Sequence, residues 1–126
     1  DVDVPSDAVV LGDAGLVERV LANVVENALR HGVGAPVRLD AAVRAGRVVV
    51  RVVDRGPGVD PERHEDLFQP FQRLGDVPRG SGVGLGLAVA RGFTEAMGGT
   101  LTAEDTPGGG LTLVLDLPSA EANDES

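Results

Sequence analysis

The sequence contains no cysteine, tryptophan or tyrosine, and aromatic residues make up only 2% of its 126 positions. The absence of cysteine excludes disulfides, thiolate metal sites and cysteine nucleophiles. No apolar run approaches the roughly 20 residues that a membrane-spanning helix needs, so we expect a soluble domain without direct membrane contact. With so few aromatic residues, the core has to be built from valine, leucine and alanine.

Basic residues are also scarce, with 11 of them against 20 acidic residues and a formal net charge of -9. This charge disfavours a broad electrostatic contact with nucleic acid or with an anionic membrane, because both contacts need a basic patch. We therefore expect no nucleic-acid partner. A phosphate-bearing ligand would have to be bound by local donors that overcome the repulsion from the rest of the surface.

Glycine, by contrast, is abundant, and its densest run is Gly80-Ser81-Gly82-Val83-Gly84-Leu85-Gly86-Leu87. An apolar helical pattern follows directly. Backbone amides in such a run can approach a ligand closely, and the positive end of a following helix attracts an anion. A phosphate-binding loop and a flexible connection are both compatible with the run taken alone.

Hydrophobic periodicity predicts an α+β fold made of a mixed sheet with helices on one face, a two-layer α/β sandwich. The expected elements are short strands at 2–4 and 9–11, an amphipathic helix at 16–31, strands at 37–43 and 48–53, a helix at 84–97, and strands at 100–103 and 111–117. The irregular stretch 54–82, with a helical fragment near 61–67, is interpreted as a functional loop or lid. We expect one domain at 1–118 and a disordered acidic tail at 119–126.

Two asparagines on the first predicted helix form a candidate binding strip. Asn23 and Asn27 are four positions apart, so they point within ~40° of each other, with Arg30 nearby. An asparagine oxygen is a hard ligand that suits Mg²⁺, and an arginine can bind phosphate oxygens. The alternative is that all three are ordinary solvated positions.

A second candidate follows the strand at 48–53. Asp54 stands at its end, and Gly56 and Gly58 allow the backbone to turn close to a ligand. A carboxylate in this place can accept a hydrogen bond from an amino group, although an ordinary turn has the same pattern. Phe68 and Phe71 come later in the irregular stretch, where they could also form a small hydrophobic cluster that anchors the loop.

The order and spacing of these motifs resemble the catalytic, ATP-binding domain of sensor histidine kinases over about residues 1–118. The matching segments are 23–31 for the asparagine box, 54–58 for the first glycine box, 67–73 for the phenylalanine box and 82–86 for the second glycine box. The run 82–91 is most similar to the KdpD subfamily, whose members govern genes for potassium uptake. The resemblance implies the GHKL (Bergerat) sandwich shared with gyrase and Hsp90, and ATP and Mg²⁺ as cofactors.

The resemblance also implies a role for each matching residue. Asn27 would coordinate Mg²⁺, with Asn23 beside it, and Arg30 would contact phosphate. Asp54 would bind the adenine amino group. The segment 59–81 would be a short ATP lid. The full set of nucleotide-contacting residues expected in this way is Asn23, Asn27, Arg30, His31, Asp54, Gly56, Gly58, Phe68, Phe71, Gly80, Ser81, Gly82, Val83, Gly84, Leu85 and Gly86.

One position departs from the family pattern. Family members often carry threonine directly after the glycine that opens the last strand, where it supports the adenine-binding aspartate. Here Gly110 is followed by Leu111, and Thr112 comes one place later, which strand alternation turns to the opposite face. A backbone group or a water is therefore the expected support for Asp54.

The resemblance implies a module that transfers the γ-phosphate of Mg-ATP to a histidine on a separate dimerisation domain. Its partners would be that domain and, through it, a cognate response regulator. The full-length protein would be a homodimer, with this part as the cytoplasmic domain of a membrane-bound bacterial sensor. His64 and Glu65 faintly resemble a phosphoacceptor motif, but they lie in the irregular stretch, so we interpret His64 as a solvated residue.

Two other functions are alternatives to phosphotransfer. A conformational ATPase like gyrase or Hsp90 carries a water-activating glutamate at the position of Asn23, and an asparagine cannot act as that base. Glu26 is about 60° further round the helix. A regulatory module that binds nucleotide without catalysis is compatible with the sequence.

Overall fold

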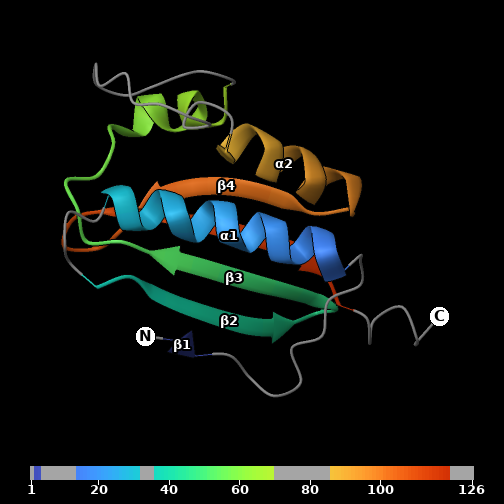
Figure 1. Cartoon of the computed structure of the whole chain (residues 1–126). Helices are drawn as coiled ribbons and strands as arrows, with labels where there is room; N and C mark the ends of the chain where they lie inside the picture. The colour runs from blue at the N-terminus through green and yellow to red at the C-terminus, as the bar shows by residue number, and fades with distance from the viewer. Residues whose placement is uncertain (1, 4–13, 32–35, 70–85, 120–126) are drawn as a thin grey trace.

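The computed structural model of the chain describes residues 2–3, 14–31, 36–69 and 86–119 (Figure 1). The elements in chain order are β1 (Val2–Asp3), α1 (Ala14–His31), β2 (Arg38–Arg44), β3 (Arg47–Val53), the 3₁₀ helix η1 (Pro61–Phe68), α2 (Gly86–Ala96), β4 (Thr100–Asp105) and β5 (Leu111–Pro118). The strand predicted at 9–11 lies outside the described residues. The other predicted elements are present, within a few residues of their expected bounds.

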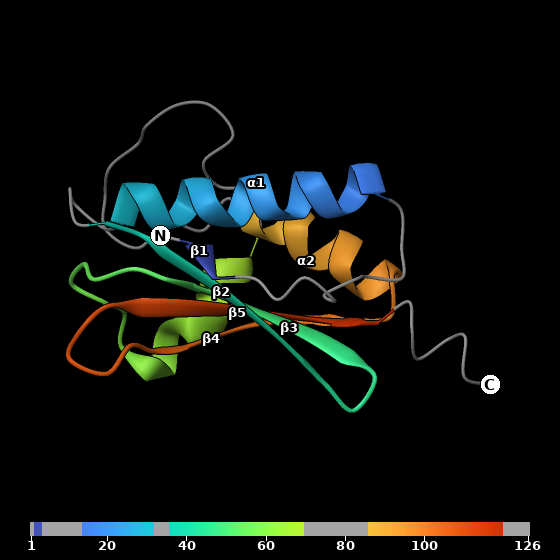
Figure 2. The same ribbon diagram turned by 90° about the horizontal axis from the view of Figure 1, so that it is seen from below.

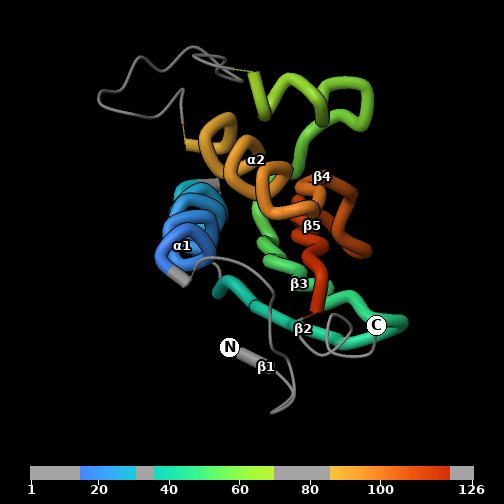
Figure 3. The backbone as a smooth tube through the Cα atoms, turned by 90° about the vertical axis from the view of Figure 1, so that its right-hand side faces the viewer, coloured from blue at the N-terminus to red at the C-terminus, as the bar shows by residue number. Residues whose placement is uncertain are grey.

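The strands form one five-stranded sheet in the order β1-β2-β3-β5-β4. β1 pairs with β2 in parallel, and the remaining pairs are antiparallel, so the sheet is mixed as predicted. Both α-helices lie on the same face of this sheet (Figure 2), and the view along the layers shows them next to each other (Figure 3). The predicted two-layer α+β sandwich is therefore confirmed.

The core lies between the helices and the sheet and consists mainly of valine, leucine and alanine. On α1 the buried residues recur every four positions, while on β3 and β5 they alternate, because helix and strand have periods near four and two. The most deeply buried side chains include Val20, Val24, Ala28, Val48, Val52, Leu101, Leu113, Leu115 and Leu117. Burial of one such valine or leucine stabilises the fold by roughly 1.5–3 kcal/mol.

Local signals account for the ends of the shorter elements. η1 begins with a proline after Asp60, whose side chain accepts a hydrogen bond from the Glu62 amide at 3.1 Å. α2 ends one residue earlier than predicted, and the amide of Gly99 then donates to the Thr94 carbonyl at 2.9 Å. No described helix is long and apolar enough to cross a membrane.

The part of the chain that the structure describes continues one residue past the domain boundary expected at 118. Ser119 is buried, and its amide donates to the carbonyl of Gly46 at 2.9 Å, in the turn between β2 and β3. This residue therefore packs with the sheet, although the sequence placed it at the start of the acidic tail. The rest of that tail, residues 120–126, lies outside the described residues.

Candidate functional site

The side chain of Asp54 is almost completely buried directly after the end of β3. One carboxylate oxygen, Oδ1, accepts hydrogen bonds from the amides of Gly56 at 2.9 Å and Leu111 at 3.1 Å. The other oxygen, Oδ2, makes no hydrogen bond with the described residues. Because its exposed fraction is only 1%, this side chain is held in one orientation, with Oδ2 left to accept a bond from an external donor.

The support for Asp54 is a backbone group, which is one of the two forms expected from the sequence. The amide of Asp54 donates to the Leu111 carbonyl at 2.9 Å, so the antiparallel ladder of β3 and β5 continues one pair beyond the strand end. This pairing brings the Leu111 amide to the carboxylate. Thr112 instead contacts Thr106, with 2.8 Å between their hydroxyl oxygens.

The loop after Asp54 turns where the sequence places its glycines. Gly58 has a φ of +81°, in the region that favours glycine, and a Cβ atom there would lie 3.2 Å from the Gly110 carbonyl oxygen. The loop therefore packs directly on the backbone of the β4–β5 hairpin. Arg55 adds a second connection, because its Nη1 donates to the Pro107 carbonyl at 2.7 Å.

The two asparagines of α1 have different surroundings. Asn27 is buried, with an exposed fraction of 7%, and its Oδ1 has no hydrogen-bond partner among the described residues. Asn23 is half-buried, and its Nδ2 donates at 3.1 Å to the carbonyl of Gly86, the first residue of α2. Arg30 is exposed and lies 3.6 Å from Glu26 in an ion pair. Among these three side chains, Asn27 therefore has a buried oxygen that can bind a ligand.

Phe68 is buried at the end of η1 and contacts a residue that the sequence did not single out. The guanidinium of Arg91, on α2, lies over its ring. Arg91 also forms two hydrogen bonds with Glu65 on η1. The hydrogen bonds from Arg91 lower the pKa of Glu65 and raise the pKa of Arg91, and partial burial opposes both shifts. This contact connects η1 with α2.

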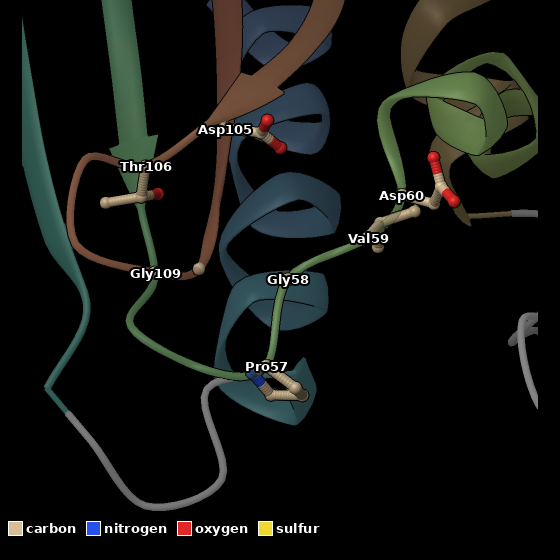
Figure 4. Close-up of a pocket in the computed structure, with 8 residues that line it drawn as sticks. Pro57, Gly58, Val59, Asp60, Asp105, Thr106 and Gly109 are labelled. Atoms are coloured by element: carbon tan, nitrogen blue, oxygen red, sulfur yellow. The ribbon is translucent and has the colours of Figure 1, made fainter.

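A cavity of about 390 Å³ is lined by the loop after β3 and by the β4–β5 hairpin (Figure 4). Its lining residues are Pro57, Gly58, Val59, Asp60, Asp105, Thr106, Gly109 and Gly110. Neither Asp54 nor Asn27 lines it. The cavity is therefore a neighbour of the candidate site and does not contain its two buried oxygen groups.

The C-terminal end of α1 and the end of β3 lie at the same end of the molecule, which brings the Asn27 and Asp54 regions to one side (Figure 1). Several expected contact residues lie outside the described residues, namely Phe71, Gly80, Ser81, Gly82, Val83, Gly84 and Leu85, together with the side chain of His31. Within the described part, no group of three or more His, Cys, Asp or Glu residues is placed to bind a metal.

Sequence reasoning missed two residues that the structure places around the site. Thr106 donates to the Asp54 carbonyl oxygen at 3.2 Å, and Arg91 holds Phe68. Arg91 is the last residue of the segment 82–91, but nothing local in the sequence indicates its partners on η1. The sequence gives even less indication of the contact between Thr106 and Asp54, because a threonine before a Pro-Gly turn is common.

The chain matches proteins of established families over most of its length. The profile of the family described as "Histidine kinase-, DNA gyrase B-, and HSP90-like ATPase" matches residues 12–121. The sensor protein KdpD of Mycobacterium tuberculosis is 58% identical over 115 residues, which cover 91% of this chain and 13% of that protein. The chain thus spans only a small part of this relative.

Solved structures of histidine kinases have the same fold. A nucleotide-free form of the catalytic domain of histidine kinase ThkA is similar with a TM-score of 0.78 and 26% identity, covering 94% of this chain and 79% of that one. Full-length ShkA in complex with AMPPNP gives a TM-score of 0.76 and 29% identity over 93% of this chain and 25% of that one. The chain therefore belongs to the family of histidine kinase-, DNA gyrase B- and HSP90-like ATPases, as a catalytic domain of the sensor histidine kinase type.

Proposed function

We propose that the chain binds Mg-ATP and transfers the γ-phosphate to a histidine on a separate dimerisation domain. The observation that carries this proposal is the state of Asp54, a buried carboxylate with two amide donors on Oδ1 and an available Oδ2. A carboxylate oxygen accepts hydrogen bonds, so it matches an exocyclic amino group such as that of adenine. The ShkA structure, a relative in fold and sequence, contains the ATP analogue AMPPNP.

The residues present also fit a magnesium ion. Asn27 offers a buried amide oxygen without a partner among the described residues. Mg²⁺ is usually bound by one or two protein oxygens together with substrate phosphates and waters. A site with few protein ligands therefore agrees with the absence of a larger carboxylate or histidine cluster in the described part of the chain. When bound, the ion would neutralise charge on the phosphates.

The contribution of the chain itself would be positioning, which is the main requirement of phosphoryl transfer. Asp54 would orient the base, and Asn27 would orient the phosphates at the other end of the nucleotide. Asn23 would act differently from Asn27, because its hydrogen bond to Gly86 connects α1 with the start of α2. We propose phosphate contact for Arg30, whose side chain would have to leave Glu26 to make it.

The KdpD relative suggests the biological setting. At 58% identity over 91% of this chain, we propose that the chain is part of a KdpD-type sensor that responds to potassium or osmotic conditions. Its partners would be the dimerisation domain of the same kinase and, through that domain, a response regulator. We further propose that the full-length protein is a membrane-bound homodimer and that this domain lies in the cytoplasm.

A conformational ATPase is less well supported by the site. Glu26 is the acidic residue nearest Asn23 on α1, but its side chain is 69% exposed and pairs with Arg30. A general base that activates water has to lie within hydrogen-bond reach of the water it deprotonates. An exposed, paired glutamate on the outer side of α1 does not meet this requirement.

The test is phosphotransfer in trans. The chain is incubated with γ-labelled Mg-ATP and the helical dimerisation domain of M. tuberculosis KdpD, and acid-labile phosphohistidine is measured on the acceptor. We expect label that disappears when the acceptor histidine is replaced by alanine. Nucleotide binding without transfer would instead indicate a regulatory module, and phosphate release without transfer would indicate an ATPase. Label on His64 of the chain itself would contradict the assigned division of roles.

A further inference from the structure

A pair of buried threonines contacts the backbone of Asp54. Thr106 directly follows β4 and Thr112 lies on β5, and each has an exposed fraction of 4%. The Thr106 hydroxyl is 3.2 Å from the Asp54 carbonyl oxygen and 2.8 Å from the Thr112 hydroxyl. These contacts join the hairpin to a residue 52 positions earlier in the chain.

The direction of the hydrogen bonds follows from the number of protons. The Asp54 carbonyl can only accept, so the single hydroxyl proton of Thr106 points at it. Thr106 then has only lone pairs to offer Thr112, and the Thr112 hydroxyl must donate. The three groups form one relay, from Thr112 to Thr106 to the Asp54 carbonyl.

This relay completes the anchoring of the Asp54 backbone. The hairpin binds the Asp54 amide through the Leu111 carbonyl, Oδ1 through the Leu111 amide, and the carbonyl through Thr106. The peptide group after Asp54 therefore cannot rotate without breaking a buried hydrogen bond. The amides of Gly56 and Leu111 both bind Oδ1 of Asp54. Because Gly56 follows that peptide group in the chain, the position of the carboxylate, and with it Oδ2, depends on the peptide group.

We propose that Thr106 and Thr112 are positioning residues that determine specificity for a base with an exocyclic amino group. This inference rests on the proposed function, in which Asp54 binds adenine. Without the Thr106 hydroxyl, the Asp54 carbonyl loses its donor in a buried place, and the peptide group shifts toward another one. A small shift of Oδ2 then weakens its bond to the amino group and leaves contacts to ribose and phosphates unchanged.

The test compares two nucleotides that differ at the amino group. Dissociation constants for ATP and for inosine triphosphate (ITP), which has an oxygen in place of the adenine amino group, are measured by calorimetry in Mg²⁺. For Thr106→Val we expect about a tenfold weaker ATP affinity and an ITP affinity within about twofold of the unaltered chain. Thr112→Val should reduce ATP affinity less, by about threefold, because Thr106 keeps its own hydroxyl.

Two further variants separate positioning from stability. Thr106→Ser retains the hydroxyl and should restore most of the preference for ATP. Thr94→Val removes another buried threonine hydroxyl, which donates to the Ala90 carbonyl at 2.7 Å within α2, and should leave the ATP to ITP ratio unchanged. If Thr106→Val does not fold, the comparison of Thr112→Val with the unaltered chain tests the inference.

The possible outcomes distinguish a failure of this inference from a failure of the proposed function. A chain that binds no ATP contradicts the proposed function. A chain that binds ATP and ITP equally contradicts the assignment of Asp54, and the inference with it. If the unaltered chain prefers ATP but Thr106→Val and Thr112→Val weaken both nucleotides by the same factor, or neither, the threonines have a purely structural role and the inference is wrong.

Discussion

The guanidinium carbon of Arg91 lies 4.2 Å from the centre of the Phe68 ring, and the same group donates to both carboxylate oxygens of Glu65, at 2.8 and 3.1 Å. Phe68 and Glu65 lie on η1, and Arg91 lies on α2. One side chain therefore holds together the elements that precede and follow residues 70–85. An arginine suits this place because it can stack on a ring and bind a carboxylate with two nitrogens.

The first prediction concerns this contact. Arg91→Met should lower the free energy of unfolding by about 1 kcal/mol, the sum of a partly exposed cation–π contact and an exposed ion pair. Arg91→Lys should lose less stability than Arg91→Met, because it keeps a positive charge near the ring. It should still lose some, because it cannot form the two parallel hydrogen bonds. Urea unfolding measures both. The matched control Arg63→Met, which removes an exposed pair within η1, should have a smaller effect than Arg91→Met.

The second prediction concerns pH. Hydrogen bonds from Arg91 hold the pKa of Glu65 below its usual value of 4.5. A lowered pKa in the folded state stabilises the fold above the unfolded pKa, and this contribution disappears as the pH falls through the folded value. The stability difference between the unaltered chain and Glu65→Gln should therefore be constant from neutral pH to about 5 and shrink below 4.5.

Because the pair is exposed, the full difference is about 0.5 kcal/mol or less. The control Glu62→Gln changes another glutamate of η1 that Arg91 does not contact. A stability difference for Glu65→Gln that grows on acidification would contradict the assigned ion pair.

The third prediction concerns Asn27. Asn27→Ala should remove most of the Mg²⁺ dependence of ATP binding, because the buried Oδ1 that would bind the ion is lost. ATP affinity is measured with Mg²⁺ and with a chelator for both chains. Asn23→Ala serves as the comparison, because its amide bonds to Gly86 and it should keep the Mg²⁺ dependence. An Asn27→Ala chain with unchanged Mg²⁺ dependence would show that the metal binds elsewhere.

The fourth prediction uses two neighbouring glycines with nearly the same φ angle. Gly109 and Gly110 have φ values of +116° and +115°, but a Cβ at Gly110 would lie 2.0 Å from the Asp54 carbonyl oxygen, whereas nothing lies within 4 Å of one at Gly109. The strain of a positive φ is thus common to both alanine variants. Gly110→Ala should cost at least about 2 kcal/mol more than Gly109→Ala in urea unfolding. Equal losses of stability for the two variants would contradict the close contact between Gly110 and Asp54.

The fifth prediction is a stabilising change. Gly92 lies inside α2, and nothing lies within 4 Å of a Cβ atom built there. Gly92→Ala should raise the free energy of unfolding by about 0.5–1 kcal/mol, because alanine loses less backbone entropy in a helix. Gly99→Ala should do the opposite, since its Cβ would lie 2.2 Å from the Asp116 carbonyl oxygen. A thermal melt distinguishes the two directions.

Local patterns predicted most of the fold. The apolar period of α1 and the alternation in β3 and β5 follow from which faces are buried, and the turn at Ala45 and Gly46 has positive φ at both residues, as a tight hairpin requires. The sequence also proposes Asp54 and Asn27 as binding residues, and the structure buries both side chains. Both lie where a buried element meets a turn or a polar strip, and such places are recognisable from neighbouring residues alone.

Contacts between distant segments could not be predicted in the same way. Thr106 reaches Asp54 because β4 and β5 pair with Asp105 opposite Leu111, and that register depends on the conformation of a glycine-rich hairpin. Arg91 reaches Phe68 because η1 packs against α2. Neither contact produces a periodic pattern in the sequence, because each is made by a single side chain.

The bond from the Leu111 amide to Asp54 also affects how such domains are recognised from sequence. Every residue type except proline carries a backbone N–H, so the identity of the side chain at this position can vary without loss of the donor. A search pattern that requires a hydroxyl-bearing residue after the last glycine would pass over this chain. The absence of threonine there is therefore no evidence that a chain has lost its aspartate-centred site.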